Sequence, residues 1–179
     1  MTRTAATIAI LILSVTNING QSSSVATSDR LSAPLVNPAA LALGNAQGFG
    51  VQIDADADLS ALGPVNLVLN GPMSGYAVTL AGDDLRHRLA LGIPIGGALS
   101  LGASWQWRAD AFADGDVELG FLARPAAAIS LGATARLPID GSGTYRLGVG
   151  LRPLTLLGMR DSLMTLAADG YAVHETDGQ

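Results

Sequence analysis

Apolar and polar side chains alternate along much of the second half of the chain. Between Leu99 and Arg108, one set comprises Leu99, Leu101, Ala103, Trp105 and Trp107, and the other comprises Ser100, Gly102, Ser104, Gln106 and Arg108. A period of two places the two sets on opposite faces of a β-strand. The predicted strand is longer than the usual strand of about five or six residues in globular sheets, and its length matches a tilted transmembrane strand.

The same period recurs along most of the chain. It is clear at residues 117–124, 129–137 and 145–152. Less regular segments lie at residues 48–57, 65–70, 75–81 and 86–94, and a ninth candidate lies near residues 162–168. We therefore predict an all-β fold, an antiparallel transmembrane β-barrel of about eight strands or an incomplete portion of a larger barrel, because bacterial single-chain barrels have even strand numbers. An eight-stranded barrel would be filled by its own side chains.

The first twenty residues predict a secretory signal peptide. Arg3 precedes an apolar run, residues 5–15, that is too short to cross a bilayer as a helix. Cleavage is expected after Gly20, or as late as Ala26 in the small-residue run from Ser24 to Ala26. A buried N-terminal strand or helix is the alternative. An exported chain that meets a membrane again must do so as a closed sheet, because lipid leaves backbone groups without water partners.

The connections between the predicted strands alternate in character. Residues 94–97 and 124–127 form tight turns with few acidic residues. Longer linkers carry Asp83, Asp84, Asp110, Asp114, Asp116 and Asp140. Short turns on one rim and acidic loops on the other are typical of the periplasmic and extracellular ends of an outer-membrane barrel. Trp105 and Trp107 lie near the acidic end of their strand, where an aromatic girdle is expected, and Tyr145 is placed at the same rim.

Charged residues on the polar face are the candidate lumen-lining residues. They are Arg88, Arg108, Glu118, Arg136 and Arg146. On a lipid face each arginine would cost about 2–4 kcal/mol near the membrane midplane, so these side chains are expected to face the lumen or a rim. One interpretation is an anion-selective lining or a site for an anionic ligand. We favour the other, a polar lumen in which the arginines pair with Glu118, loop aspartates and backbone carbonyls.

Glycine recurs at the middle of the polar face. The recurring positions are Gly92, Gly102, Gly120, Gly132 and Gly148. Glycine weakens a strand interior, so its recurrence indicates a place where another part of the protein approaches closely. A weak ancestral hairpin repeat is the alternative, and we favour close packing inside a curved sheet.

Composition argues against several classes of function. The net charge of −5 disfavours nucleic-acid binding, and the absence of cysteine excludes disulfides and thiolate chemistry. No metal-ligand spacing, phosphate loop or dinucleotide motif is present, so no metal or cofactor is expected. His87 lies near Asp83 and Asp84, but no serine has a nucleophile motif around it, and we expect no catalytic residues.

One short segment resembles a known family. Residues 36–42, which read Val-Asn-Pro-Ala-Ala-Leu-Ala, resemble the Asn-Pro-Ala stretch of long-chain fatty-acid transporter-like barrels. The resemblance implies that Asn37, Pro38 and Ala39 form an element leading from an N-terminal plug into the barrel. Residues 99–107, 147–153 and 163–169 also resemble the barrel domain that precedes the protease part of some bacterial signal peptide peptidase-like proteins. No protease segment is visible, so no peptidase activity is implied.

These observations predict one exported domain with four parts. They are a signal peptide at residues 1–20, with cleavage as late as residue 26, an N-terminal segment at 21–46, a β-barrel at 47–169 and a polar tail at 170–179. We expect a non-enzymatic Gram-negative outer-membrane protein related to transporters of hydrophobic compounds. Its expected partners are outer-membrane lipid, lipopolysaccharide and the barrel-assembly machinery. The alternatives are a small barrel acting as a scaffold or interaction module, and a soluble secreted β-sandwich or adhesin-like domain.

Overall fold

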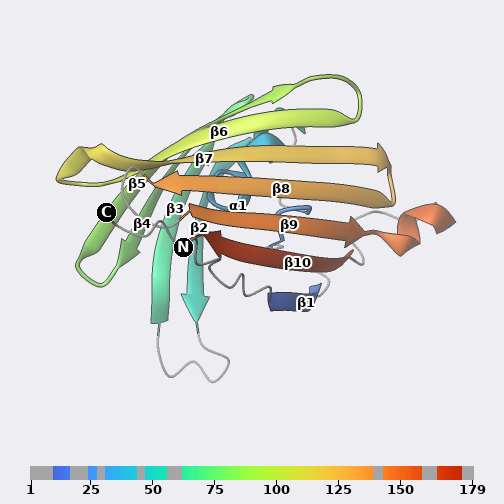
Figure 1. Cartoon of the computed structure of the whole chain (residues 1–179), viewed down its shortest axis with the longest axis horizontal. Helices are drawn as coiled ribbons and strands as arrows, with labels where there is room; N and C mark the ends of the chain where they lie inside the picture. Colours follow the sequence, from blue (N-terminus) through green and yellow to red (C-terminus); the bar gives the residue numbers. More distant parts are fainter. Residues whose placement is uncertain are drawn as a thin grey trace, which may run out of the picture.

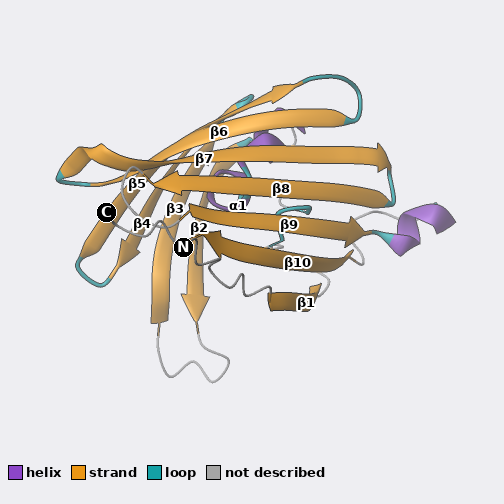
Figure 2. Ribbon diagram, viewed as in Figure 1, coloured by secondary structure: helices purple, strands orange, loops and turns teal. Residues whose placement is uncertain are grey.

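A single antiparallel sheet dominates the molecule, and a short N-terminal segment lies against one of its faces (Figure 1). The computed structural model describes residues 10–16, 24–27, 31–43, 47–55, 62–138, 143–158 and 165–174. Strands make up most of these residues, as Figure 2 shows. None of the helices among them is long and apolar enough to cross a membrane.

Nine strands follow one another as a continuous antiparallel meander. They are β2 (Gly48–Ala55), β3 (Leu62–Asn70), β4 (Ser74–Ala81), β5 (Asp84–Pro94), β6 (Leu99–Arg108), β7 (Ala111–Ala126), β8 (Ile129–Pro138), β9 (Gly143–Leu151) and β10 (Thr165–His174). Strand β1 (Ile10–Thr16) pairs antiparallel with β10, so β1 and β2 are the two edges of a ten-stranded sheet. The prediction of an antiparallel all-β fold is confirmed, and the estimate of about eight strands is too low.

Two strands extend beyond the segments predicted for them. A register shift between Gln106 and Arg108 lets Arg108 pair with Ala111, so β7 begins inside the predicted acidic linker and Asp114 and Asp116 lie on a strand. Strand β10 continues to His174 because its last residues stay paired with β9. It therefore enters the segment predicted to be a polar tail.

Part of the apolar run predicted as a signal peptide forms β1. Its pairing with β10 runs from Ile10 opposite Tyr171 to Thr16 opposite Thr165. A strand at this place was the alternative to a leader, but pairing in the full-length chain does not test export, and the signal peptide stays a prediction. Gly20, the earlier of the two expected cleavage positions, lies outside the described residues.

The N-terminal segment comprises the turn at residues 24–27, helix α1 (Ala33–Val36) and the 3₁₀ helix η1 (Pro38–Leu43). Helix α1 ends at Val36, and its C-cap Asn37 is extended, as expected for a residue that precedes proline. Helix η1 packs on β4 to β7, and Leu41 lies in a small buried cluster with Ala90 and Leu122 of the sheet. We call the face covered by this segment the inner face and the opposite one the outer face.

The two faces of the sheet have opposite chemistry. On β8, Ser130, Gly132 and Thr134 are buried on the inner face, whereas Ile129 and Leu131 are exposed on the outer face. The same inversion runs across the sheet, where the exposed large apolar residues include Phe49, Val51, Leu67, Leu69, Leu89, Leu91, Leu101, Leu119, Phe121, Leu147 and Val149. The buried side of this sheet is therefore its polar side.

Candidate functional site: the inner face of the sheet

A track of glycines crosses the inner face and receives the N-terminal segment. Its members share one property, which is that an added Cβ would crowd that segment: Gly50, Gly75, Gly92, Gly102, Gly120, Gly132, Gly148 and Gly150. At Gly92, for example, a Cβ would lie 2.7 Å from the carbonyl oxygen of Pro38. The predicted close packing at the recurring glycines is confirmed. The partner is the N-terminal segment, which at Gly148 shares the space with Asp169 of β10.

Asn37 ties the N-terminal segment together and to the sheet. Its side chain is fully buried. Its Nδ2 donates to the carbonyl oxygen of Val25 at 2.7 Å and to that of Phe121 on β7 at 3.0 Å, and its Oδ1 accepts from the backbone N–H of Ala39 at 3.1 Å. The amide thus uses both its donor and its acceptor atoms, which a carboxylate or an apolar side chain could not do. Pro38 and Ala39 are buried beside it against the glycine track.

Arg88 and Glu118 form a buried ion pair beneath helix α1. An Nη atom of Arg88 donates to a carboxylate oxygen of Glu118 at 3.3 Å. The same guanidinium donates to the carbonyl oxygens of Pro34 and Leu35, at 3.2 and 3.1 Å, and to the side chain of Gln106. It therefore connects three strands of the sheet to the carboxyl end of α1, where free carbonyls favour a cation.

Two other predicted residues pair with aspartates on neighbouring strands. The Nε atom of Arg136 donates to Asp116 at 2.9 Å. An Nη atom of Arg146 donates to Asp169 at 3.2 Å. Asp169 also accepts hydrogen bonds from the turn at residues 24–27, so this pair contacts the N-terminal segment as well.

Arg108 lies apart from the other four predicted residues. Its side chain is largely exposed at the end of β6, and its Nε atom is 3.7 Å from Asp84 and 3.9 Å from Asp110. Arg86 forms a closer pair with Asp84 at the same rim. The structure therefore brings four of the predicted residues together along the inner face, namely Arg88, Glu118, Arg136 and Arg146, and it places Arg108 at the rim.

Sequence reasoning missed two acidic partners. The sequence pattern places Asp116 in an acidic linker, although this residue stands two positions before Glu118 and so on the same face of a strand. Asp169 is the last residue of the predicted barrel segment, and the sequence gives it no role. Its pairing opposite Gly148 on β9 puts it on the inner face beside Arg146. The period of two could have found Asp116, whereas Asp169 required the register between two strands.

A row of aromatic rings crosses the outer face near the acidic rim. The ring of His87 on β5 stacks between those of Tyr76 and Trp107, and Phe112 packs edge-on against Trp107 and Trp105. The Oη of Tyr76 lies 2.7 Å from Nδ1 of His87. His87 is thus part of an aromatic row. In the described part of the chain, no three histidine, aspartate or glutamate side chains come together as metal ligands.

Comparison with protein-family models, with curated proteins and with solved structures gives no match for this chain.

Proposed function

We propose that the chain is a non-enzymatic outer-membrane protein of the β-barrel class, with its outer face in lipid hydrocarbon and its inner face filled by the N-terminal segment. The resemblance of residues 36–42 to fatty-acid transporter-like barrels points further, to a relative of transporters of hydrophobic compounds. The proposed setting is the outer membrane of a Gram-negative cell, reached by way of a signal peptide and the barrel-assembly machinery.

The observation that carries this proposal is the inverted distribution of side chains across the sheet. Leu147, at the middle of β9, is 67% exposed, while Gly148 and Gly150 beside it are buried against the N-terminal segment. Monomeric soluble proteins rarely expose continuous apolar surfaces larger than a few hundred Å². Rows of exposed leucine, valine and phenylalanine on successive strands match hydrocarbon better than water.

Strand length supports the same setting. Strand β6 has ten residues. At about 3.3 Å per residue and a tilt of about 45°, such a strand spans about 23 Å, close to the apolar band of about 25 Å on outer-membrane barrels. The aromatic row of Tyr76, His87 and Trp107 then falls at one border of that band, next to Arg86 and Arg108, as expected of a lipid–water interface.

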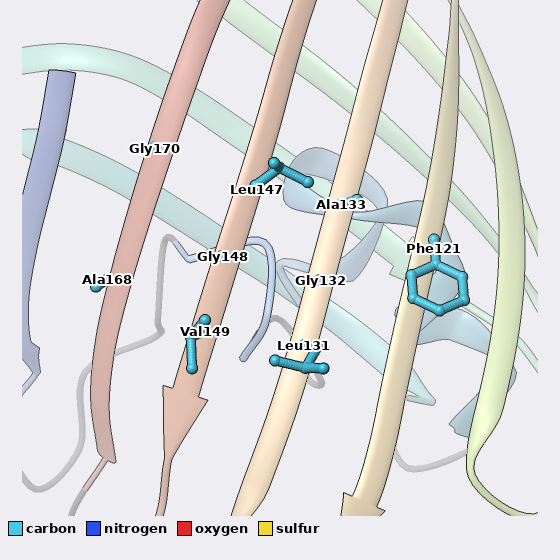
Figure 3. Close-up of a pocket in the computed structure, with 9 residues that line it drawn as sticks. All are labelled: Phe121, Leu131, Gly132, Ala133, Leu147, Gly148, Val149, Ala168 and Gly170. Carbon is cyan, nitrogen blue, oxygen red and sulfur yellow. The ribbon is translucent and has the colours of Figure 1, made fainter. Parts of the chain in front are cut away.

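A shallow groove on the outer face adds a local argument. It runs over β7 to β10 between the side chains of Phe121, Leu131, Leu147 and Val149 (Figure 3). Its floor is formed by glycines and alanines, and polar atoms contribute little to it. A hydrocarbon chain of a lipid matches this lining, whereas water would find few hydrogen-bond partners there.

Fractionation of cells that express the full chain tests the proposal. We expect the protein in the outer-membrane fraction, resistant to carbonate washing, soluble only with detergent, and faster on gels before heating than after. A protein that stays in the aqueous phase without detergent would contradict the proposal and favour the soluble β-sandwich.

A filled inner face favours a second candidate function, a scaffold or interaction module in the same membrane. The Arg88–Glu118 pair and the glycine track hold the N-terminal segment across the interior side of the sheet. A protein of this kind would conduct no ions in planar bilayers, whereas a transporter relative with a displaceable segment would show solute-dependent openings.

A further inference from the structure

The turn at residues 24–27 is among the most deeply buried parts of the molecule. Ser24, Val25, Ala26 and Thr27 are 2%, 0%, 0% and 3% exposed. From sequence alone this run was also a candidate end of the signal peptide, because small residues of this kind precede the bond that a signal peptidase hydrolyses. The contacts of this run favour its role as a turn of the folded protein over its role as the end of the signal peptide.

Asp169 on β10 binds the turn through both carboxylate oxygens. Its Oδ1 accepts from the Ser24 hydroxyl at 2.6 Å, and its Oδ2 accepts from the backbone N–H of Val25 at 3.1 Å. Arg146 donates to the same Oδ2 from β9. Hydrogen bonds to a carboxylate are stronger than those between neutral groups, so these contacts form a specific binding site for the turn.

Asn37 and three glycines complete the binding site for the turn. Asn37 donates to the carbonyl oxygen of Val25 from the other side of the turn. A Cβ at Gly132 would overlap the Val25 carbonyl and the Ala26 Cα, and Cβ atoms at Gly148 and Gly150 would overlap side chains of the turn. Two strands therefore carry glycine where the turn needs room, and Asp169 and Ser130 share the space at Gly148 and Gly150.

We infer that residues 24–27 belong to the exported protein, and that its leader is removed on the N-terminal side of Ser24 and not after Ala26. The inference rests on the proposed function, which requires export. In the hydrolysis, water adds across one peptide bond: the carbonyl carbon takes the hydroxyl, the carbon–nitrogen bond breaks, and the released amine takes the proton. At the bond between Ala26 and Thr27 this reaction would cut the turn itself.

Cleavage after Ala26 would also disturb the groups that hold the turn. Asp169 would lose both hydrogen bonds from the turn, and Asn37 would lose one of its two acceptors. The new ammonium group on Thr27 would lie at a position that is now buried. Gly132 would lose the backbone of Val25 and Ala26 that now packs on it, and a cavity left behind costs free energy in proportion to its volume.

The N-terminal residue of the protein purified from the membrane fraction tests the inference. We expect intact-mass measurement and N-terminal sequencing to give a first residue after Met1 and no later than Ser24, and a chain that keeps Met1 would overturn the inference. A mature chain that begins at Thr27 would overturn the inference. The fraction from which the protein is recovered tests the proposed function separately, because a soluble protein could still carry the turn.

Two fusions to a leader with a known cleavage position give a second readout. One leader is joined before Gln21 and the other before Thr27, so that the mature chains differ only in residues 21–26. We expect at least about tenfold less heat-modifiable, folded protein for the chain that begins at Thr27, because it lacks two hydrogen bonds to a carboxylate. Equal folding of the two chains would overturn the inference.

An aspartate substitution on each fusion provides the matched control. Asp169→Ala is expected to lower the folded fraction of the chain that begins at Gln21 and to have little further effect on the chain that begins at Thr27. Asp114→Ala removes a carboxylate that is exposed on β7 and should leave both chains unchanged. Equal sensitivity of the two chains to Asp169→Ala would contradict the binding of the turn by Asp169.

Discussion

Single glycines decide how closely the N-terminal segment approaches the sheet. A Cβ at Gly102 would overlap the backbone of Pro38 and Ala39, and neither strand nor segment has a flexible side chain there to move aside. We expect Gly102→Ala to destabilise the folded protein by about 1–3 kcal/mol, the usual cost of overpacking. Urea titration of the detergent-solubilised protein measures the change.

Gly97→Ala is the control for this prediction. Gly97 lies in the turn after β5, and an added Cβ there would meet nothing within 4 Å. The substitution should leave the unfolding midpoint nearly unchanged. Equal effects of the two substitutions would contradict the close packing of the segment on the glycine track.

Glu118 compensates a buried guanidinium. If Glu118→Gln removes its charge, Arg88 keeps its carbonyl partners but loses its counter-ion inside the inner face. We expect a loss of about 3–5 kcal/mol in the free energy of unfolding. Arg86→Gln breaks the exposed pair with Asp84 and should cost about 1 kcal/mol or less. Urea unfolding of both variants distinguishes a structural pair from a dispensable one.

The tryptophans of β6 report where the aromatic row lies. Trp105 and Trp107 are the two tryptophans of the chain. If the row marks the lipid–water border, bromines near the lipid headgroups should quench their fluorescence more than bromines near the bilayer centre. The measurement uses vesicles with lipids brominated at different depths. Quenching by aqueous iodide but by no brominated lipid would contradict this placement.

How well an element could be predicted from sequence depended on its neighbours in the chain. The bounds of β6 follow from its alternation, because turn residues limit it on both sides. The start of β7 could not be predicted in this way, since the shift in its pairing with β6 draws acidic residues into a strand. Likewise, the N-terminal segment has no sequence periodicity from which its packing on the inner face could be predicted. The glycines predicted a close neighbour, but only the long-range contacts of Asn37 and Asp169 identify it.

The strand order of the sheet determines how its two edges could pair with each other. Antiparallel neighbours alternate in direction, so β2 and β10, the first and last strands of the meander, run the same way. Direct closure between them would require a parallel ladder. Strand β1 runs opposite to both and pairs with β10, so the ten-stranded sheet of the full-length chain is open between β1 and β2. Removal of a leader before Ser24 would also remove β1 and leave β2 and β10 as the two edges.

Leucine-to-arginine substitutions at two exposed sites test the membrane setting of the outer face most directly. Leu147, at the middle of β9, is 67% exposed, and Leu156, in helix η2 (Pro153–Leu157) outside the sheet, is 77% exposed. In lipid, Leu147→Arg should cost about 2–4 kcal/mol of folding free energy and Leu156→Arg about 0–1 kcal/mol. Reversible unfolding from bilayers measures both values. Near-zero costs at both positions, as expected for side chains that already face water, would contradict the account.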